Sequence, residues 1–67
     1  MEITYNNQTQ EVQEETLVSD FVFSHLGEKQ NGIAVAINET IVPKTEWAKT
    51  YLKVHDNLLI IKATQGG

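Results

Sequence analysis

The sequence predicts an α+β domain in which a mixed β-sheet packs on one main helix. Three observations support this fold class. The chain has 67 residues, which allows only one domain. Strand-like segments flank a single helical segment, in the order ββαββ followed by a short helical turn and a last strand. That last strand, residues 58–64, is almost continuously apolar, as expected for a central strand covered on both faces.

The first segment predicts a β-hairpin. Ile3 and Tyr5 alternate with polar neighbours, which is the periodicity of a strand with one buried face. Residues 6–8, Asn-Asn-Gln, tolerate the left-handed conformation that tight hairpin turns require. A second strand is therefore expected over residues 9–13.

The next segment predicts the helix. Thr16 is a suitable N-cap because its hydroxyl can accept a hydrogen bond from the first turn. Gly27 can end the helix in a left-handed conformation, so we expect the helix to run to Leu26. Five apolar side chains are expected to form its buried stripe: Leu17, Val18, Phe21, Val22 and Leu26.

Two more strands and a helical turn should follow the helix. Residues 33–37 predict a strand, and the turn at residues 38–39 leads into another strand over residues 40–42. Pro43 cannot donate a hydrogen bond to a sheet, so it ends this strand and can open a short helical turn that holds Trp47. We expect Trp47 to be a structural aromatic in or at the rim of the core.

The C-terminal part completes the predicted architecture. Asp56 and Asn57 are expected to form the last turn before the strand over residues 58–64. We expect this strand to lie at the centre of the sheet, parallel to the first. The result is the β-grasp (ubiquitin-like) fold, with a single domain over residues 1–64 and a flexible tail over residues 65–67.

One face of the last strand is predicted to dock a partner. A single helix covers only one face of a sheet, so apolar side chains are left on the other. The expected core contains Leu58 and Ile60 together with Ile3, Tyr5, Phe21, Val35 and Ile37. The expected docking patch contains Leu59, Ile61, Ala63 and Ala36. The alternative is that loops or the turn around Trp47 cover this patch.

Composition excludes several functions. The chain has no cysteine, which removes thiol chemistry and disulfides and fits a cytosolic protein. It has no arginine, and nine acidic residues against five lysines give a net charge of −4, so nucleic acid is a poor partner. All the lysines follow Glu28; the acidic first half is either a solvated face or a means of steering toward a basic partner. No segment resembles a membrane span or a signal peptide, and we expect a cytoplasmic monomer.

Side chains for catalysis or metal binding are scarce. Asp20, Ser24 and His25 share the predicted helix, but we expect His25 to point away from the other two, so no triad is predicted. His25 and His55 have no third ligand at metal-binding spacing, so no metal is expected. The glycine-containing loops lack the spacing and lysine of a phosphate-binding loop, so nucleotide should bind a partner and not this chain.

The chain ends in Gly66-Gly67, directly beyond the last strand. Glycine has no side chain, so such an end can enter a narrow channel and leaves its carbonyl carbon open to attack. A terminal carboxylate is ionised at neutral pH and must become an acyl-adenylate before another atom can replace its oxygen. We expect Gly67 to be the reactive residue, with Gln65 and Gly66 as the tail; the alternative is an inert frayed terminus.

A family resemblance supports this hypothesis. Residues 34–47, which include Asn38 and the sequence Val-Pro-Lys at 42–44 followed by Trp47, resemble the ThiS family of sulfur carriers within the wider ThiS/MoaD group. The Asp56 turn, the apolar strand and the final glycines extend the resemblance over nearly the whole chain. Two departures are His55, where the family often has glycine, and Gln65 before the glycines.

The resemblance implies a carrier that is a co-substrate and not an enzyme. In the family, a ThiF-like adenylyltransferase uses ATP and magnesium to adenylate the terminal carboxylate, here that of Gly67. Sulfur from a cysteine desulfurase system then gives a thiocarboxylate, which the thiazole synthase ThiG consumes in making thiazole phosphate from deoxyxylulose phosphate and a glycine-derived imine. The chain itself would bind no cofactor.

Three alternatives remain open from the sequence. The first is a sulfur carrier for another pathway, such as molybdopterin or cysteine synthesis. The second is a ubiquitin-like modifier joined to lysines through Gly67. The third is a binding module whose tail is inert.

Overall fold

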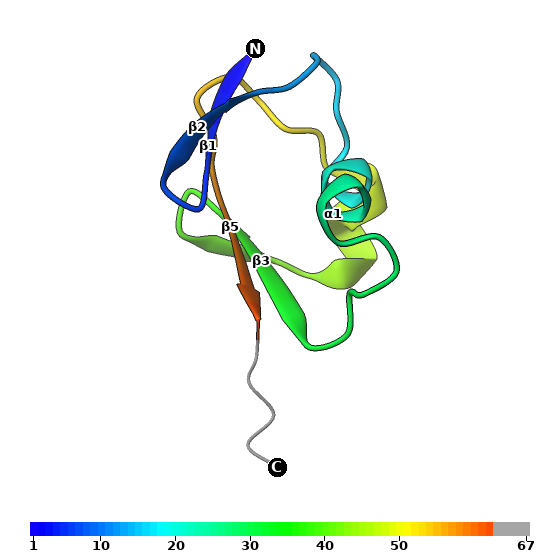
Figure 1. Ribbon diagram of the computed structural model, residues 1–67. Helices are drawn as coiled ribbons and strands as arrows, with labels where there is room; N and C mark the ends of the chain where they lie inside the picture. The colour runs from blue at the N-terminus through cyan, green and yellow to red at the C-terminus, as the bar shows by residue number, and fades with distance from the viewer. Residues whose placement is uncertain (63–67) are drawn as a thin grey trace.

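The computed structural model describes residues 1–62, which form one five-stranded mixed sheet and two helices (Figure 1). The sheet order is β2-β1-β5-β3-β4, with β5 parallel to β1 and antiparallel to β3. This arrangement confirms the predicted β-grasp fold and the central position of the last strand. The elements are β1 Glu2–Tyr5, β2 Gln8–Glu11, α1 Val18–Leu26, β3 Ile33–Ile37, β4 Thr40–Val42, the 3₁₀ helix η1 Lys44–Lys49 and β5 Asn57–Lys62.

Two-residue turns close both hairpins. Asn6 and Asn7 have φ angles of 47° and 70°, and Asn38 and Glu39 have φ angles of 51° and 70°. Two consecutive residues with positive φ twist the chain in the sense that suits the flanking strands. Because the first turn has only two residues, Tyr5 pairs directly with Gln8, and β2 begins one residue earlier than predicted and ends at Glu11.

The start of α1 differs from the prediction. Thr16 does not cap the helix, because its hydroxyl donates to the carbonyl of Gln13 at 2.6 Å. Leu17 is the N-cap residue, in extended conformation, and forms an isolated β-bridge with Tyr51. Since a backbone contact with a distant segment holds residue 17 extended, the helix begins only at Val18.

The end of α1 lies at the predicted glycine. The N–H of Gly27 donates to the carbonyl of Phe23 at 2.7 Å, and Gly27 has φ 60°. Its ψ of −129° differs from that of a left-handed cap, and this combination of angles is open mainly to glycine.

The core lies between the sheet and the two helices. Trp47 belongs to it, with 4% of its surface exposed and its Nε1 donating to the carbonyl of Val42 at 2.9 Å. Tyr5 and Ile37 are half-buried against the core, whereas Leu17 is half-buried and lies before the helix. The buried core residues are Ile3, Val18, Phe21, Val22, Val35, Trp47, Leu52, Leu58 and Ile60. The predicted assignment of Leu58 and Ile60 to the core is therefore confirmed.

Candidate functional site

The strand that leads to the glycine tail, β5, has hydrogen-bonded neighbours in the sheet. β5 pairs with β3 along its length, from Ile37↔Leu58 to Ile33↔Lys62, and with β1 at its beginning. In Figure 1, β5 points away from the turn where it starts and toward the end of the sheet opposite the N-terminus. The predicted tail residues Gln65, Gly66 and Gly67, and the predicted docking residue Ala63, lie outside the described residues.

The start of β5 is fixed by a side-chain network. Asp56 is 7% exposed; its carboxylate accepts hydrogen bonds from Asn38 Nδ2 at 3.0 Å and from the N–H of Lys53 at 2.8 Å. Asn38 Oδ1 accepts from the N–H of Asn57 at 2.9 Å. The buried carboxylate thus joins the β3–β4 turn to the beginning of β5, and the strand that carries the tail starts from a rigid point.

The predicted last turn is displaced by two residues. The turn lies at Val54 and His55, and Asn57 is already part of β5 because it bonds to Asn38. His55 has φ 67°, a conformation that glycine adopts freely and other residues adopt at a cost. The departure at His55 therefore keeps the turn geometry at the expense of local backbone strain.

The sheet face opposite α1 carries the predicted docking residues. The register places Ala36 opposite Leu59 and Ala34 opposite Ile61, so these side chains share one face. Ile61 is 49% exposed and Leu59 is half-buried, whereas Ala36 is only 5% exposed. Ala36 therefore forms the floor of this face, between two larger neighbours.

One of those neighbours was missing from the prediction. Ile41 lies opposite Ala36 on β4 and is 58% exposed. Its alternation with Thr40 and Val42 was visible in the sequence, but the pairing that places it beside Ala36 was not. We call Ile61, Leu59, Ala36 and Ile41 the outer apolar face. The alternative that loops or the turn around Trp47 cover this face is wrong for residues 1–62, because Ile41 and Ile61 are exposed there and Trp47 packs in the core.

A second set of side chains lies at the end of α1. His25 packs against Phe21 with ring centroids 4.2 Å apart and against Tyr5 at 4.7 Å, and the rings are tilted in both pairs. Its Nδ1 lies 3.1 Å from Ser24 Oγ, so the prediction that His25 points away from Ser24 is wrong. Ser24 Oγ, however, donates its proton to the backbone carbonyl of Phe21 at 2.8 Å. The hydroxyl proton is therefore already used in a hydrogen bond within the helix. This cluster packs the helix end against β1.

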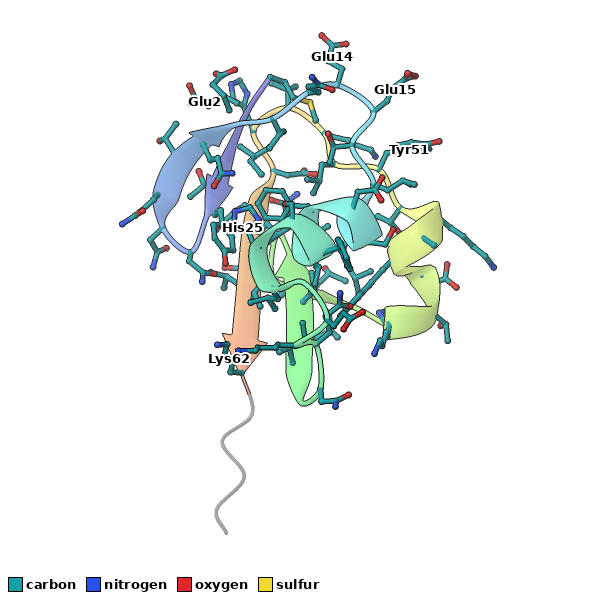
Figure 2. The ribbon with its side chains drawn as sticks, turned by 45° about the vertical axis from the view of Figure 1, so that its right-hand side comes forward. Glu2, Glu14, Glu15, His25, Tyr51 and Lys62 are labelled. Carbon is teal, nitrogen blue, oxygen red and sulfur yellow. The ribbon has the colours of Figure 1, made fainter. Side chains whose placement is uncertain are left out.

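An open pocket of about 440 Å³ lies beside the end of β5. Its lining residues are Glu28, Lys29, Asn31, Gly32, Ile33 and Lys62. Lys62 lies at the end of the molecule opposite Glu2, Glu14 and Glu15 (Figure 2). Within residues 1–62, no group of three or more His, Asp or Glu side chains is placed to hold a metal ion. No helix in this part of the chain is long and apolar enough to cross a membrane.

Comparisons with known proteins agree with this fold and with the sequence motifs. The model of the ThiS family matches residues 2–67. The sulfur carrier protein ThiS of Escherichia coli (strain K12) is 31% identical over 67 residues, which cover all of both chains. A crystal structure of the thiamine biosynthesis protein ThiS from Geobacter metallireducens superposes with a TM-score of 0.86 at 19% identity, again over all of both chains, and supports the fold. The chain belongs to the ThiS family of sulfur carriers.

Proposed function

We propose that Gly67 carries sulfur as a thiocarboxylate and delivers it to thiazole formation in thiamin biosynthesis. The observation that supports this most strongly is the position of β5 in a ThiS-family chain. It is the central strand, it is paired with β3 as far as Lys62 and with β1 at its beginning, and it leads within five residues to the glycine pair. A rigid strand of this kind gives a short tail a defined origin, so a partner that binds the domain also receives the terminal carboxylate.

The proposed chemistry has two steps at the carbonyl carbon of Gly67. First, a carboxylate oxygen attacks the α-phosphorus of ATP and pyrophosphate leaves, giving an acyl-adenylate. Then sulfur at the oxidation level of hydrosulfide attacks the carbonyl carbon, and AMP leaves with the oxygen, giving the thiocarboxylate. Neither step oxidises or reduces the carbon. Because glycine has no side chain, both nucleophilic attacks are unhindered.

The partners supply what this chain lacks. A ThiF-like adenylyltransferase would bind ATP and magnesium. A cysteine desulfurase system would supply the sulfur as a persulfide, and a thiol reductant would release it as hydrosulfide while being oxidised to a disulfide. The thiazole synthase ThiG would then accept the sulfur from Gly67. The chain is a co-substrate in each step, and we propose that it works as a monomer in the cytoplasm, where ATP is available.

The outer apolar face is the proposed docking surface for these partners. Ile61 and Ile41 are each about half exposed, and Leu59 and Ala36 lie between them. These four side chains form a continuous apolar strip across β4, β3 and β5. Ala63, which lies outside the described residues, is proposed as a further docking residue next to Lys62 in the sequence. Exposed apolar strips of this kind are typical of interaction surfaces.

Complementation of a strain that lacks its own ThiS tests this proposal. The wild-type chain should restore growth without thiamin, and deletion of Gly67 should abolish it. Glu14→Gln is a matched control, since Glu14 is exposed and lies at the end of the domain far from Lys62 (Figure 2). Growth supported by the chain without Gly67 would contradict the proposal. Conjugates linked through Gly67 to lysines, with no thiamin phenotype, would instead favour a protein modifier.

A further inference from the structure

The second half of β5 has a partner strand on one side only. β3 pairs with β5 as far as Lys62, but β1 pairs with β5 only at Thr4↔Asn57 and Tyr5↔Leu58. After Tyr5 the chain turns into β2. From residue 60 onward, the side of β5 that β1 occupied earlier is therefore an open strand edge.

The hydrogen-bonding direction of each β5 residue follows from the bonds on either side. The carbonyls of Asp56 and Leu58 accept from the N–H groups of Thr4 and Asn6, at 2.8 and 2.9 Å, so even-numbered residues face β1. The carbonyl of Asn57 accepts from the N–H of Asn38 at 2.8 Å, so odd-numbered residues face β3. Because this direction alternates along a strand, Ile60 and Lys62 face the side that β1 has left.

Asn6 marks where this edge begins. Its Oδ1 accepts a hydrogen bond from the N–H of Ile60 at 2.9 Å, so the turn side chain occupies the last donor that β1 can reach. Three backbone groups follow on the same side: the carbonyl of Ile60 and the N–H and carbonyl of Lys62. No residue in the range 1–62 forms a hydrogen bond with any of the three.

We infer that an extended segment of the adenylating enzyme pairs with this edge when it receives Gly67. The inference rests on the proposed function. The edge is continuous with the tail, since Lys62 is five residues from Gly67, so a protein that holds the tail comes close to this part of β5. Addition of a strand to an open edge is a common way of binding an extended segment, and it requires only backbone donors and acceptors.

The side chains on either face of the edge define the segment further. Ile61 lies on the outer apolar face, whereas Lys62 lines the pocket on the helix side together with Lys29 and Glu28. A pairing segment should therefore place an apolar side chain beside Ile61 and an acidic side chain beside Lys62, in strand alternation.

A second copy of this chain is a poorer occupant of the edge. Two copies paired antiparallel through residues 60–62 would bring their Lys62 side chains close together, and like charges repel. A lysine on an exposed strand edge also acts against pairing between identical chains. The charge pattern thus favours a partner with acidic residues over self-association.

Residue-resolved amide hydrogen exchange in the wild-type protein tests this inference. In the free protein, the N–H groups of Leu59 and Ile61 should be protected by β3 and that of Ile60 by Asn6, while that of Lys62 should exchange freely. In the complex with the adenylating enzyme, without ATP, exchange at Lys62 should slow by at least about tenfold. Unchanged exchange at Lys62 in a complex that adenylates Gly67 when ATP is added would overturn the inference.

Two substitutions at Lys62 separate the backbone donor from the side chain. Lys62→Pro removes the N–H that faces the open edge and leaves the bonds between β3 and residues 59 and 61 in place. Lys62→Gln keeps the N–H and removes the charge. We expect Lys62→Pro to weaken binding of the adenylating enzyme about tenfold more than Lys62→Gln does. Equal affinities of the two variants, each shown to be folded, would overturn the inference.

The outcomes also distinguish this inference from the proposed function. If the wild-type chain never forms a thiocarboxylate, the proposed function fails and the inference fails with it. If the thiocarboxylate forms while Lys62 stays unprotected in the complex, only the inference fails. Protection of Lys62 that rises with concentration in the free protein would indicate a second copy on this edge, and would also overturn it.

Discussion

Asn6 accepts a hydrogen bond from the backbone N–H of Ile60, 54 positions later in the chain, with 2.9 Å between Oδ1 and the nitrogen. This contact joins the first hairpin turn to the central strand. It lies where β1 leaves β5, and it satisfies a backbone donor that no strand residue can reach there. A residue that the turn requires for its positive φ thus also stabilises the strand that leads to the tail.

We expect Asn6→Gly to remove this contact without disturbing the turn. Glycine adopts the φ of 47° readily, but it cannot accept the bond from Ile60. The free energy of unfolding should fall by about 1 kcal/mol, and the amide of Ile60 should lose protection from exchange. Asn7→Gly is the matched control, since Asn7 has φ 70° in the same turn and should lose less than about 0.5 kcal/mol. Equal losses in the two variants would contradict the assigned role of Asn6.

Asp56→Asn tests the network at the start of β5. The substitution keeps the shape of the side chain, but one of its two positions becomes an NH₂ group that faces a donor, either Asn38 Nδ2 or the N–H of Lys53. Because Asp56 is 7% exposed, we expect a loss of about 1–3 kcal/mol in chemical denaturation. Glu14→Gln, at an exposed site, serves as the control and should change stability by less than about 0.5 kcal/mol. An equally small change at Asp56 would mean that the network contributes little.

Ile61→Glu tests the outer apolar face. Ile61 is 49% exposed, so the fold should tolerate a charge there, with a change of less than about 1 kcal/mol in the free energy of unfolding. Binding of the adenylating enzyme, measured by calorimetry, should weaken at least about tenfold because the charge would be desolvated at an apolar contact. A folded variant with unchanged affinity would show that partners dock elsewhere.

Ile60→Ala is the counterpart on the other face of the same strand. Ile60 is 9% exposed and belongs to the core, so truncation leaves a cavity and should cost about 2–5 kcal/mol. The single tryptophan, Trp47, lies in the same core and reports unfolding by its fluorescence. If Ile61→Glu destabilised the protein more than Ile60→Ala, the assignment of the two faces would be wrong.

Sequence reasoning predicted the features that depend on local patterns. The alternation of Leu58 and Ile60 with Leu59 and Ile61 was enough to separate the two faces of β5, because one helix can cover only one of them. The turn at Asn6 and Asn7 was also predicted from local pattern, because asparagine tolerates positive φ whatever the rest of the chain does. The order of the elements then led to the fold.

Features that depend on contacts between distant segments were not predicted correctly. Thr16 has the chemistry of an N-cap, but the bridge between Leu17 and Tyr51 delays the helix. The local pattern places Asn57 in a turn, because it does not reveal the hydrogen bond between Asn57 and Asn38, two residues 19 positions apart in sequence. The open edge of β5 follows from where β1 ends in the sheet register, which no composition or periodicity specifies. Pairing between strands thus supplied what the local pattern lacked.

Mass spectrometry of the intact protein tests the central claim most directly. The chain is incubated with its adenylating enzyme, ATP, magnesium and a sulfur donor, and compared with the same reaction without ATP. We predict a mass increase equal to the exchange of one oxygen for one sulfur, located by fragmentation to Gly67, and no such increase without ATP or after deletion of Gly67. A terminus that becomes adenylated but never exchanges oxygen for sulfur would contradict the proposed function.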